Sequence, residues 1–138
     1  MCWTIRAAGP SLRRMPSPRA NPTTVANRVK RIMAKLPEAA CVPHGDHLLL
    51  EVRGKRFGWY MNSHHGDGRL VINCKTSPGT RLTLEESPPI GYHIPKYVGK
   101  KGWVGLWLDV PDTDWTAAEE LLREAYRLSA PAKLRALV

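Results

Sequence analysis

The sequence predicts an α+β fold in which an antiparallel sheet packs against helices. Two observations lead to this prediction. Apolar residues recur at helical spacing near both ends of the chain, over about 22–36 and 115–128. Between these segments, three strand-like stretches follow one another and are separated by glycine-containing turns. The chain has 138 residues, of which 43% are apolar, as expected for one domain with one core.

The first 20 residues are expected to be a mobile basic extension, with the domain itself spanning residues 21–138. This stretch mixes Gly, Pro, Ser and Arg without helical or strand periodicity, so it offers no face to bury. Met15 leaves a second explanation open, in which translation starts there. Residues 1–35 hold 8 of the 21 Lys and Arg and no acid, so the rest of the chain is nearly neutral.

The first predicted helix spans residues 22–36. Asn21 is a suitable N-cap and Pro22 suits the first helical position. The apolar residues at helical spacing are Val25, Val29, Ile32, Met33 and Leu36.

A three-stranded meander is predicted next, over residues 47–53, 55–62 and 69–75. Gly54 separates the first two strands and can take the positive φ that a tight hairpin requires. The turn SHHGDG, residues 63–68, connects the second strand to the third.

The second half of the chain adds a short helix, a strand and two helices. Ser77 and Pro78 begin a helix that two prolines stop after Glu86. Residues 90–101 are expected to form an ordered loop and residues 102–109 a strand with apolar residues on both faces. Asp112 or Asp114 then caps a helix over 115–128, and Pro131 opens a final turn or helix, giving the order α-β-β-β-α-β-α-α.

Composition limits the class of protein. No apolar stretch approaches the roughly 20 residues that cross a bilayer, and the start of the chain lacks the apolar region of a secretion signal. We therefore expect a soluble, cytoplasmic protein. The three cysteines form no CxxC pair, so free thiols are expected rather than disulfides or a zinc site.

Two basic segments are candidate contacts for nucleic-acid phosphates. One is the hairpin tip, with Arg53, Lys55 and Arg56, and the other is the run KYVGKKGW, with Lys96, Lys100 and Lys101. Glycines in the second segment allow backbone N–H groups to approach an anion. The alternative for both is an ordinary solvated turn, whose charges keep the protein soluble and prevent edge pairing.

Two histidine-containing turns are candidate metal sites. His64, His65 and Asp67 share one turn, and His44, Asp46 and His47 share another. Two separate turns give no assurance that three or four ligands converge, and polar turns use His, Asp and Gly for backbone reasons. No metal or other cofactor is therefore predicted.

No enzyme is predicted either. The sequence has no GxSxG, no HExxH and no cysteine paired with a motif-placed histidine. The aromatic residues Trp59, Tyr60, Trp103 and Trp107 are suited to stacking on bases, but packing in the core is the more common role of such side chains.

Several segments together resemble one family. They are LPEA at 36–39, VRGKRFGWYMNSHHGDGRLVINCK at 52–75, PKYVGKKGWVGLWLD at 95–109 and the ending DWTAAEELLREAYRLSAPAKL. Over about residues 22–137 the chain resembles the MmcQ/YjbR family. The resemblance implies a frataxin-like (CyaY-like) α+β shape and a DNA-binding protein with a double-wing arrangement, and it brings no catalytic set.

The family's signature positions fall on three segments of this chain. They include Arg53, Gly54, Lys55 and Phe57, then His64 to Arg69, and then Gly99, Lys101, Gly102 and Trp103. Iron binding is not implied, because it depends on an acidic first helix and this one has no acid.

The leading hypothesis is a non-enzymatic protein that contacts the DNA backbone without sequence preference. Its expected phosphate contacts are Arg53, Lys55, Arg56, Arg69, Lys96, Lys100 and Lys101. The alternative is a small-ligand or protein-interaction domain, in which SHHGDG and GKKGW line one pocket with His64, His65, Asp67 and Trp103.

Overall fold

The computed structural model describes residues 20–138, so the mobile extension predicted for residues 1–20 lies, apart from Ala20, outside the described residues. The strands are β1 (Ala39–His44), β2 (His47–Val52), β3 (Lys55–Asn62), β4 (Leu70–Lys75), β5 (Tyr92–His93) and β6 (Trp103–Trp107). The helices are α3 (Pro22–Ala34), α4 (Pro78–Glu86), α5 (Trp115–Ser129) and α6 (Ala132–Arg135), with the 3-10 turns η1 (His64–Gly66) and η2 (Val98–Lys101). The predicted α+β class is confirmed.

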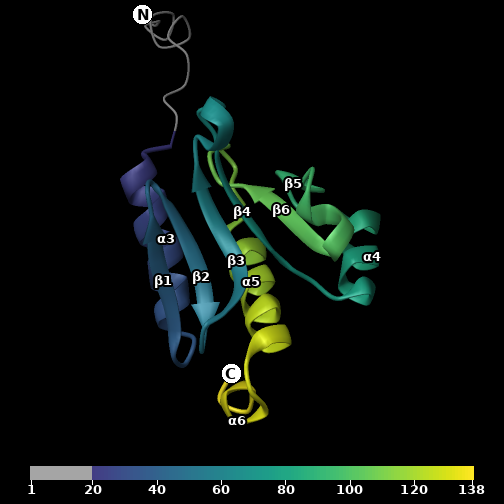
Figure 1. Ribbon diagram of the computed structural model, residues 1–138. Coiled ribbons are helices and arrows are strands. Elements are labelled where there is room, and N and C mark those ends of the chain that lie inside the picture. The colour runs from purple at the N-terminus through teal and green to yellow at the C-terminus, as the bar shows by residue number, and fades with distance from the viewer. Residues whose placement is uncertain (1–19) are drawn as a thin grey trace, which may run out of the picture.

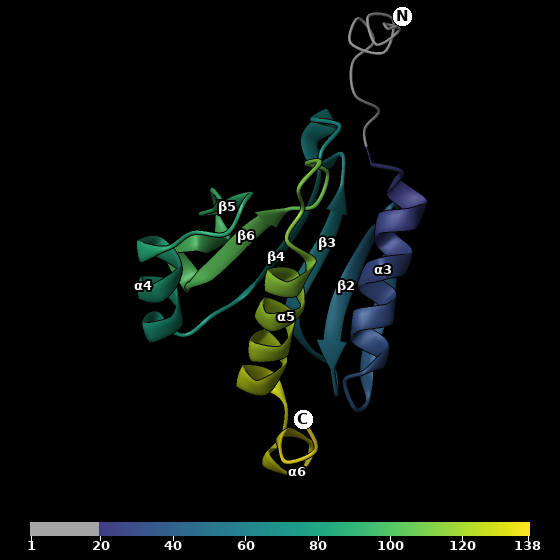
Figure 2. The ribbon, with the colours of Figure 1, turned by 180° about the vertical axis from the view of Figure 1, so that it is seen from behind.

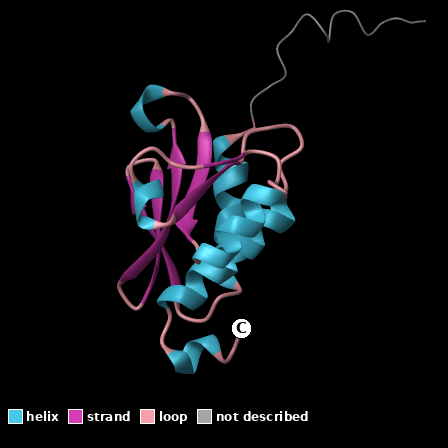
Figure 3. Ribbon diagram, turned by 90° about the vertical axis from the view of Figure 1, so that its right-hand side faces the viewer, coloured by secondary structure: helices cyan, strands magenta, loops and turns pink. Residues whose placement is uncertain are grey.

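The strands form one antiparallel sheet in the order β1-β2-β3-β4-β6-β5. Helices α3 and α5 lie together on one face of this sheet, as Figures 1 and 2 show from opposite sides. Helix α4 lies at the side of the sheet near β6 (Figure 1). In the side view of Figure 3, the strands and the main helices form two layers, and no α-helix of residues 20–138 covers the other face of the sheet.

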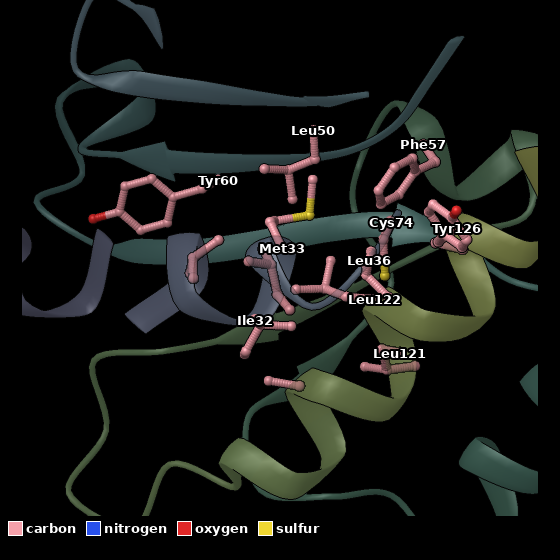
Figure 4. Close-up of a cluster of buried hydrophobic side chains, with 14 of the residues drawn as sticks. Ile32, Met33, Leu36, Leu50, Phe57, Tyr60, Cys74, Leu121, Leu122 and Tyr126 are labelled. Carbon is pink, nitrogen blue, oxygen red and sulfur yellow. The ribbon is translucent and has the colours of Figure 1, made fainter. Parts of the chain in front are cut away.

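The core fills the space between the sheet and the two long helices. Tyr126 is fully buried on α5, its hydroxyl donates to the Pro37 carbonyl at 2.8 Å, and its ring meets Phe57 edge to face. Figure 4 shows Met33 and Leu122 pointing into the same space from α3 and α5. Burial of these apolar side chains is the main term that stabilises the fold.

Each long helix begins at a cap that the sequence supplies. Asn21 Oδ1 accepts from the amide of Thr23 at 2.9 Å at the start of α3. Asp114, rather than Asp112, caps α5, since its Oδ1 accepts from the amide of Ala117 at 2.9 Å. Side-chain acceptors at this position satisfy N–H groups that have no partner within the helix.

The β2–β3 hairpin turns on the pair Arg53-Gly54, with φ of 51° and 78°. Positive φ at both central residues is the geometry that two-residue hairpins favour. A bulge follows, because Leu50 pairs with Gly58 and Glu51 with Arg56. Phe57 is the extra residue and is fully buried.

Two strands were not predicted. β1 occupies residues for which no strand was proposed, and β5 lies inside the predicted loop 90–101. β1 contains Pro43, which is depleted in strands except at sheet edges, and β1 is an edge strand. β5 has only two residues, too few to show alternation.

No helix among residues 20–138 is long and apolar enough to cross a membrane. Cys41 and Cys74 are free, and Cys74 is fully buried.

Candidate nucleic-acid interface and ligand cleft

Strand pairing brings the two predicted basic segments to the same end of the sheet. β3 begins at Lys55, just after the hairpin tip, while Lys75 at the end of β4 pairs with Trp103 at the start of β6. Lys100 and Lys101 lie in η2, immediately before β6. Since β3 and β6 flank β4, both segments lie at the end of the sheet where β4 ends.

The cations at this end differ in how they are engaged. Arg53 is held by Glu38, with contacts of 2.7 and 3.0 Å, and both side chains are half exposed. Arg56 lies 3.7 Å from Glu51 and 4.6 Å from the ring centre of Trp59. Across the described part of the chain, no acidic side chain pairs with three exposed lysines at this end: Lys55, Lys100 and Lys101.

Arg69 has a different environment from the other predicted phosphate contacts. It lies at the opposite end of the sheet and donates to both carboxylate oxygens of Asp109, at 2.7 and 2.9 Å. Asp109 is only 4% exposed and also accepts from the Leu70 amide at 3.0 Å. Burial opposes its ionisation, but these hydrogen bonds outweigh burial and hold the pKa of Asp109 below its usual value. We therefore assign Arg69 a structural role.

A cleft of about 540 Å³ lies on the sheet face that the helices leave open. Its floor follows a single row of the pairing register, because Trp59 pairs with Asn73, Asn73 with Gly105, and Gly105 with His93. Trp107, from the neighbouring row, also lines the cleft. Residues that are far apart in the sequence thus form one concave surface.

Gly105 leaves the space that brings two polar side chains together in this cleft. A Cβ at residue 105 would collide with the His93 ring and would lie 2.8 Å from Asn73 Oδ1. The missing side chain therefore permits the imidazole and the amide to lie together above β6. His93 also stacks on Trp107, with ring centres 4.4 Å apart, and the Arg69 guanidinium lies 4.1 Å from the centre of the same indole.

Asn73 carries a buried acceptor that the described residues do not satisfy. The side chain is 7% exposed, and its Oδ1 has no hydrogen-bond partner among residues 20–138. Leaving such a group unpaired costs about 1–3 kcal/mol. A buried polar group left unpaired calls for a functional or structural explanation.

The protonation of His93 follows from its contacts. Burial lowers the pKa of His93, the hydrogen bond with the Gly91 carbonyl raises it, and the charge of Arg69 lowers it, with a net lowering. The ring is therefore neutral at pH 7. Nδ1 lies 3.0 Å from Gly91 O, which can only accept, so the proton sits on Nδ1 and Nε2 is an acceptor.

The residues predicted to form a ligand pocket are only partly brought together. His64 and Asp67 line the cleft, as does Lys96, whereas Trp103 is buried at 8% exposure and does not line it. The side chain of His65 lies outside the described part of the structure. From the second predicted segment, it is Lys96 to Val98 that reach the cleft rather than GKKGW.

Sequence reasoning missed the centre of this cleft. Asn73 and His93 are not among the predicted site residues, and packing in the core is the expected role of Trp59 and Trp107. Side chains alternate between the two faces of a strand, which is enough to show that Trp59 and Met61 share a face of β3. The signal that would have joined them to Asn73 and His93 is the strand register, which the sequence does not specify.

The histidine turns do not assemble a metal site in the described chain. Among residues 20–138, no three His, Cys, Asp or Glu side chains are placed to hold a metal ion. His47 Nδ1 instead accepts from the amide of Asn62 at 3.0 Å, and the His47 ring meets that of His64 edge to face.

The fold and this surface define a small α+β protein with one face covered by helices and an open face that carries an aromatic cleft. The YjbR family model matches residues 34–128, more than half of the chain. The chain therefore belongs to the YjbR family, which confirms the family predicted from the sequence. A search of curated proteins found no match.

Proposed function

We propose that this protein is a non-enzymatic DNA-binding protein that contacts the phosphate backbone through the end of the sheet where β3 and β6 begin. The observation that carries the proposal is the set of three exposed lysines there, Lys55, Lys100 and Lys101, without acidic partners in the described chain. Ammonium groups that are not already neutralised release counterions from DNA when they meet phosphates.

The neighbouring arginines support the same surface to a smaller degree. Arg53 and Arg56 remain about half exposed, so each can keep its carboxylate contact and still present N–H groups to a phosphate. Contacts of this kind read no base edges, so sequence preference is expected to be weak. We place the activity in the cytoplasm, where free thiols such as those of Cys41 and Cys74 persist.

The test compares two double variants that each remove two positive charges. Lys100→Ala with Lys101→Ala removes charge from the proposed interface, while Lys30→Ala with Arg31→Ala removes it from exposed positions on α3. Affinity for a short duplex is measured at several salt concentrations. The first variant should bind more weakly and lower the salt slope by about 2, since each phosphate contact contributes roughly 0.9.

The control variant should keep the affinity and slope of the unmodified protein. Neither pair should change the melting temperature much, because exposed charges contribute within about 0.5 kcal/mol. Absence of duplex binding, or equal losses from the two double variants, would rule out this interface.

A further inference from the structure

The cleft on the open sheet face is built like a trough. Trp59 on β3 and His93 on β5 stand at the two ends of one register row, with Asn73 and Gly105 between them. The residues between the two rings are smaller, and Gly105 has no side chain at all. Because β3 and β5 are separated by two strands, the trough is about 14 Å across at the backbone, enough for one flat ring to lie against an indole.

The aromatic surface of this trough is partly available for stacking. Trp59 is half-buried, and Tyr97, which also lines the cleft, is 71% exposed. Trp107 is engaged by His93 and by Arg69, so its role is to hold the imidazole in place. Trp59 is contacted by the Arg56 guanidinium, 4.6 Å from its ring centre, and by the edge of His44, but neither of these residues lines the cleft. The part of Trp59 that faces the cleft is therefore the principal stacking surface for a ligand.

The polar atoms at the floor call for a hydrogen-bond donor. Nε2 of the neutral His93 is an acceptor and has no partner among the described residues. The buried Oδ1 of Asn73 is a second acceptor without a partner, and it lies beside the His93 ring above Gly105. An amino group on a flat ring carries two N–H bonds and matches this pair of acceptors.

We propose that this cleft binds one planar heterocycle of nucleobase size that carries an exocyclic amino group, stacked on Trp59 with its amino group donating to His93 Nε2. Reaching Asn73 Oδ1 as well requires a small shift of the His93 ring, which lies on a two-residue edge strand. Lys96 lines the same cleft and supplies a cation for a phosphate attached to the heterocycle.

The heterocycle has two possible sources, a free nucleoside or nucleotide and an unpaired base in a strand. Both present the same ring and amino group. The site is separate from the lysines proposed to contact duplex DNA, since Lys55, Lys100 and Lys101 do not line the cleft. Loss of one function therefore leaves the other testable.

The first measurement uses adenosine and purine riboside, which differ only in the amino group. Binding is followed by calorimetry and by quenching of tryptophan fluorescence. Adenosine should bind about three- to tenfold more tightly, as expected for one hydrogen bond. A short single-stranded oligonucleotide with one adenine, compared with its abasic counterpart, tests the strand as the source.

Variants of the cleft identify the contacts. Trp59→Leu should weaken adenosine binding by about tenfold or more, as loss of a stacking surface does. Trp115→Leu is the matched control, because Trp115 lies on α5 against Arg28 of α3 and does not line the cleft. His93→Phe keeps a ring on Trp107 but removes Nε2, so adenosine and purine riboside should then bind equally.

Each outcome decides the proposal. Binding of the adenine oligonucleotide over the abasic one, without binding of adenosine, would identify the strand as the source and support the site. The proposal is overturned if neither adenosine nor the oligonucleotide binds at millimolar concentration. It is also overturned if Trp59→Leu behaves like Trp115→Leu, or if His93→Phe keeps the preference for adenosine.

Discussion

Two ion pairs of similar geometry have different consequences because their burial differs. Arg53 meets Glu38 at 2.7 Å with both side chains 51% exposed, so water screens the pair. Arg69 meets Asp109 at the same distance, but the carboxylate is 4% exposed and also accepts from a backbone amide. Removal of Asp109 leaves the Leu70 amide and the guanidinium without their acceptor.

Asp109→Ala is therefore expected to lower the free energy of unfolding by about 2–4 kcal/mol, because a partly buried charge and an amide lose their partner. Glu38→Ala should change it by less than about 1 kcal/mol, which makes it the matched control. Chemical denaturation at pH 7 measures both. A cost for Asp109→Ala no larger than that for Glu38→Ala would contradict this interpretation of the buried pair.

At the scale of elements, α4 is attached to the domain in an unusual way. None of its residues is fully buried, and Leu84 is the apolar residue of α4 that packs, partly buried, against the core. Polar contacts attach it as well: Glu124 of α5 accepts from the hydroxyls of Thr76, of the N-cap Ser77 and of Thr80 at 2.8, 2.8 and 2.7 Å, and Arg81 donates to the Gly99 carbonyl at 2.8 Å. Burial opposes ionisation of Glu124, yet these three hydrogen bonds outweigh it and lower the pKa of the carboxyl.

Glu124→Gln should therefore loosen α4 without unfolding the domain. An amide accepts through one oxygen only and carries no charge, so at least one of the three hydroxyls loses its acceptor. Amide hydrogen exchange in residues 78–86 should become about tenfold faster, a measure of local opening. Glu120→Gln, at an exposed position on α5, the helix that carries Glu124, should leave these rates unchanged. Unchanged rates in both variants would mean that other contacts hold α4.

The elements that could be predicted are those whose residues carry their own local signal. The cap Asn21 and the turn at Gly54 are recognisable because each acts on neighbouring residues, and the same local signal narrows the cap of α5 to Asp112 or Asp114. β1 and β5 exist because another strand pairs with them, and nothing local marks them. The cleft has the same origin, since Asn73 and His93 meet only through the register, so alternation could not place them together.

At the scale of the whole molecule, one face of the sheet supports the fold and the other remains available for binding. The side between the sheet and the helices contains the buried apolar side chains, including Cys74 and Tyr60 (Figure 4). The open side contains the cleft. No α-helix in the described part of the chain covers that side (Figure 3). The free energy of unfolding should therefore depend on the titration of groups that are buried between the sheet and the helices.

This dependence of the free energy of unfolding on pH is expected at alkaline pH. Burial raises the pKa of Cys74 from 9.0 to about 12, and the charge of Glu124 acts in the same direction. Burial likewise raises the pKa of Tyr60 to about 12. A raised pKa in the folded state means that the unfolded chain loses its proton first. The stabilisation is complete below pH 9 and is lost as the pH rises toward 12.

The contribution of Cys74 can be isolated with Cys74→Ala, whose stability is compared with that of the unmodified protein at each pH. At pH 7 the variant should be less stable, since a fully buried side chain is shortened. Above pH 9 the unmodified protein should lose stability faster, by about 1.4 kcal/mol per pH unit from this one thiol. The difference between the two should therefore shrink as the pH rises, in urea titrations from pH 7 to 11 with a reductant present. If the difference in free energy of unfolding stays constant over this range, Cys74 ionises equally easily in the folded and unfolded chains. Its position between the sheet and the helices would then not protect the thiol from water.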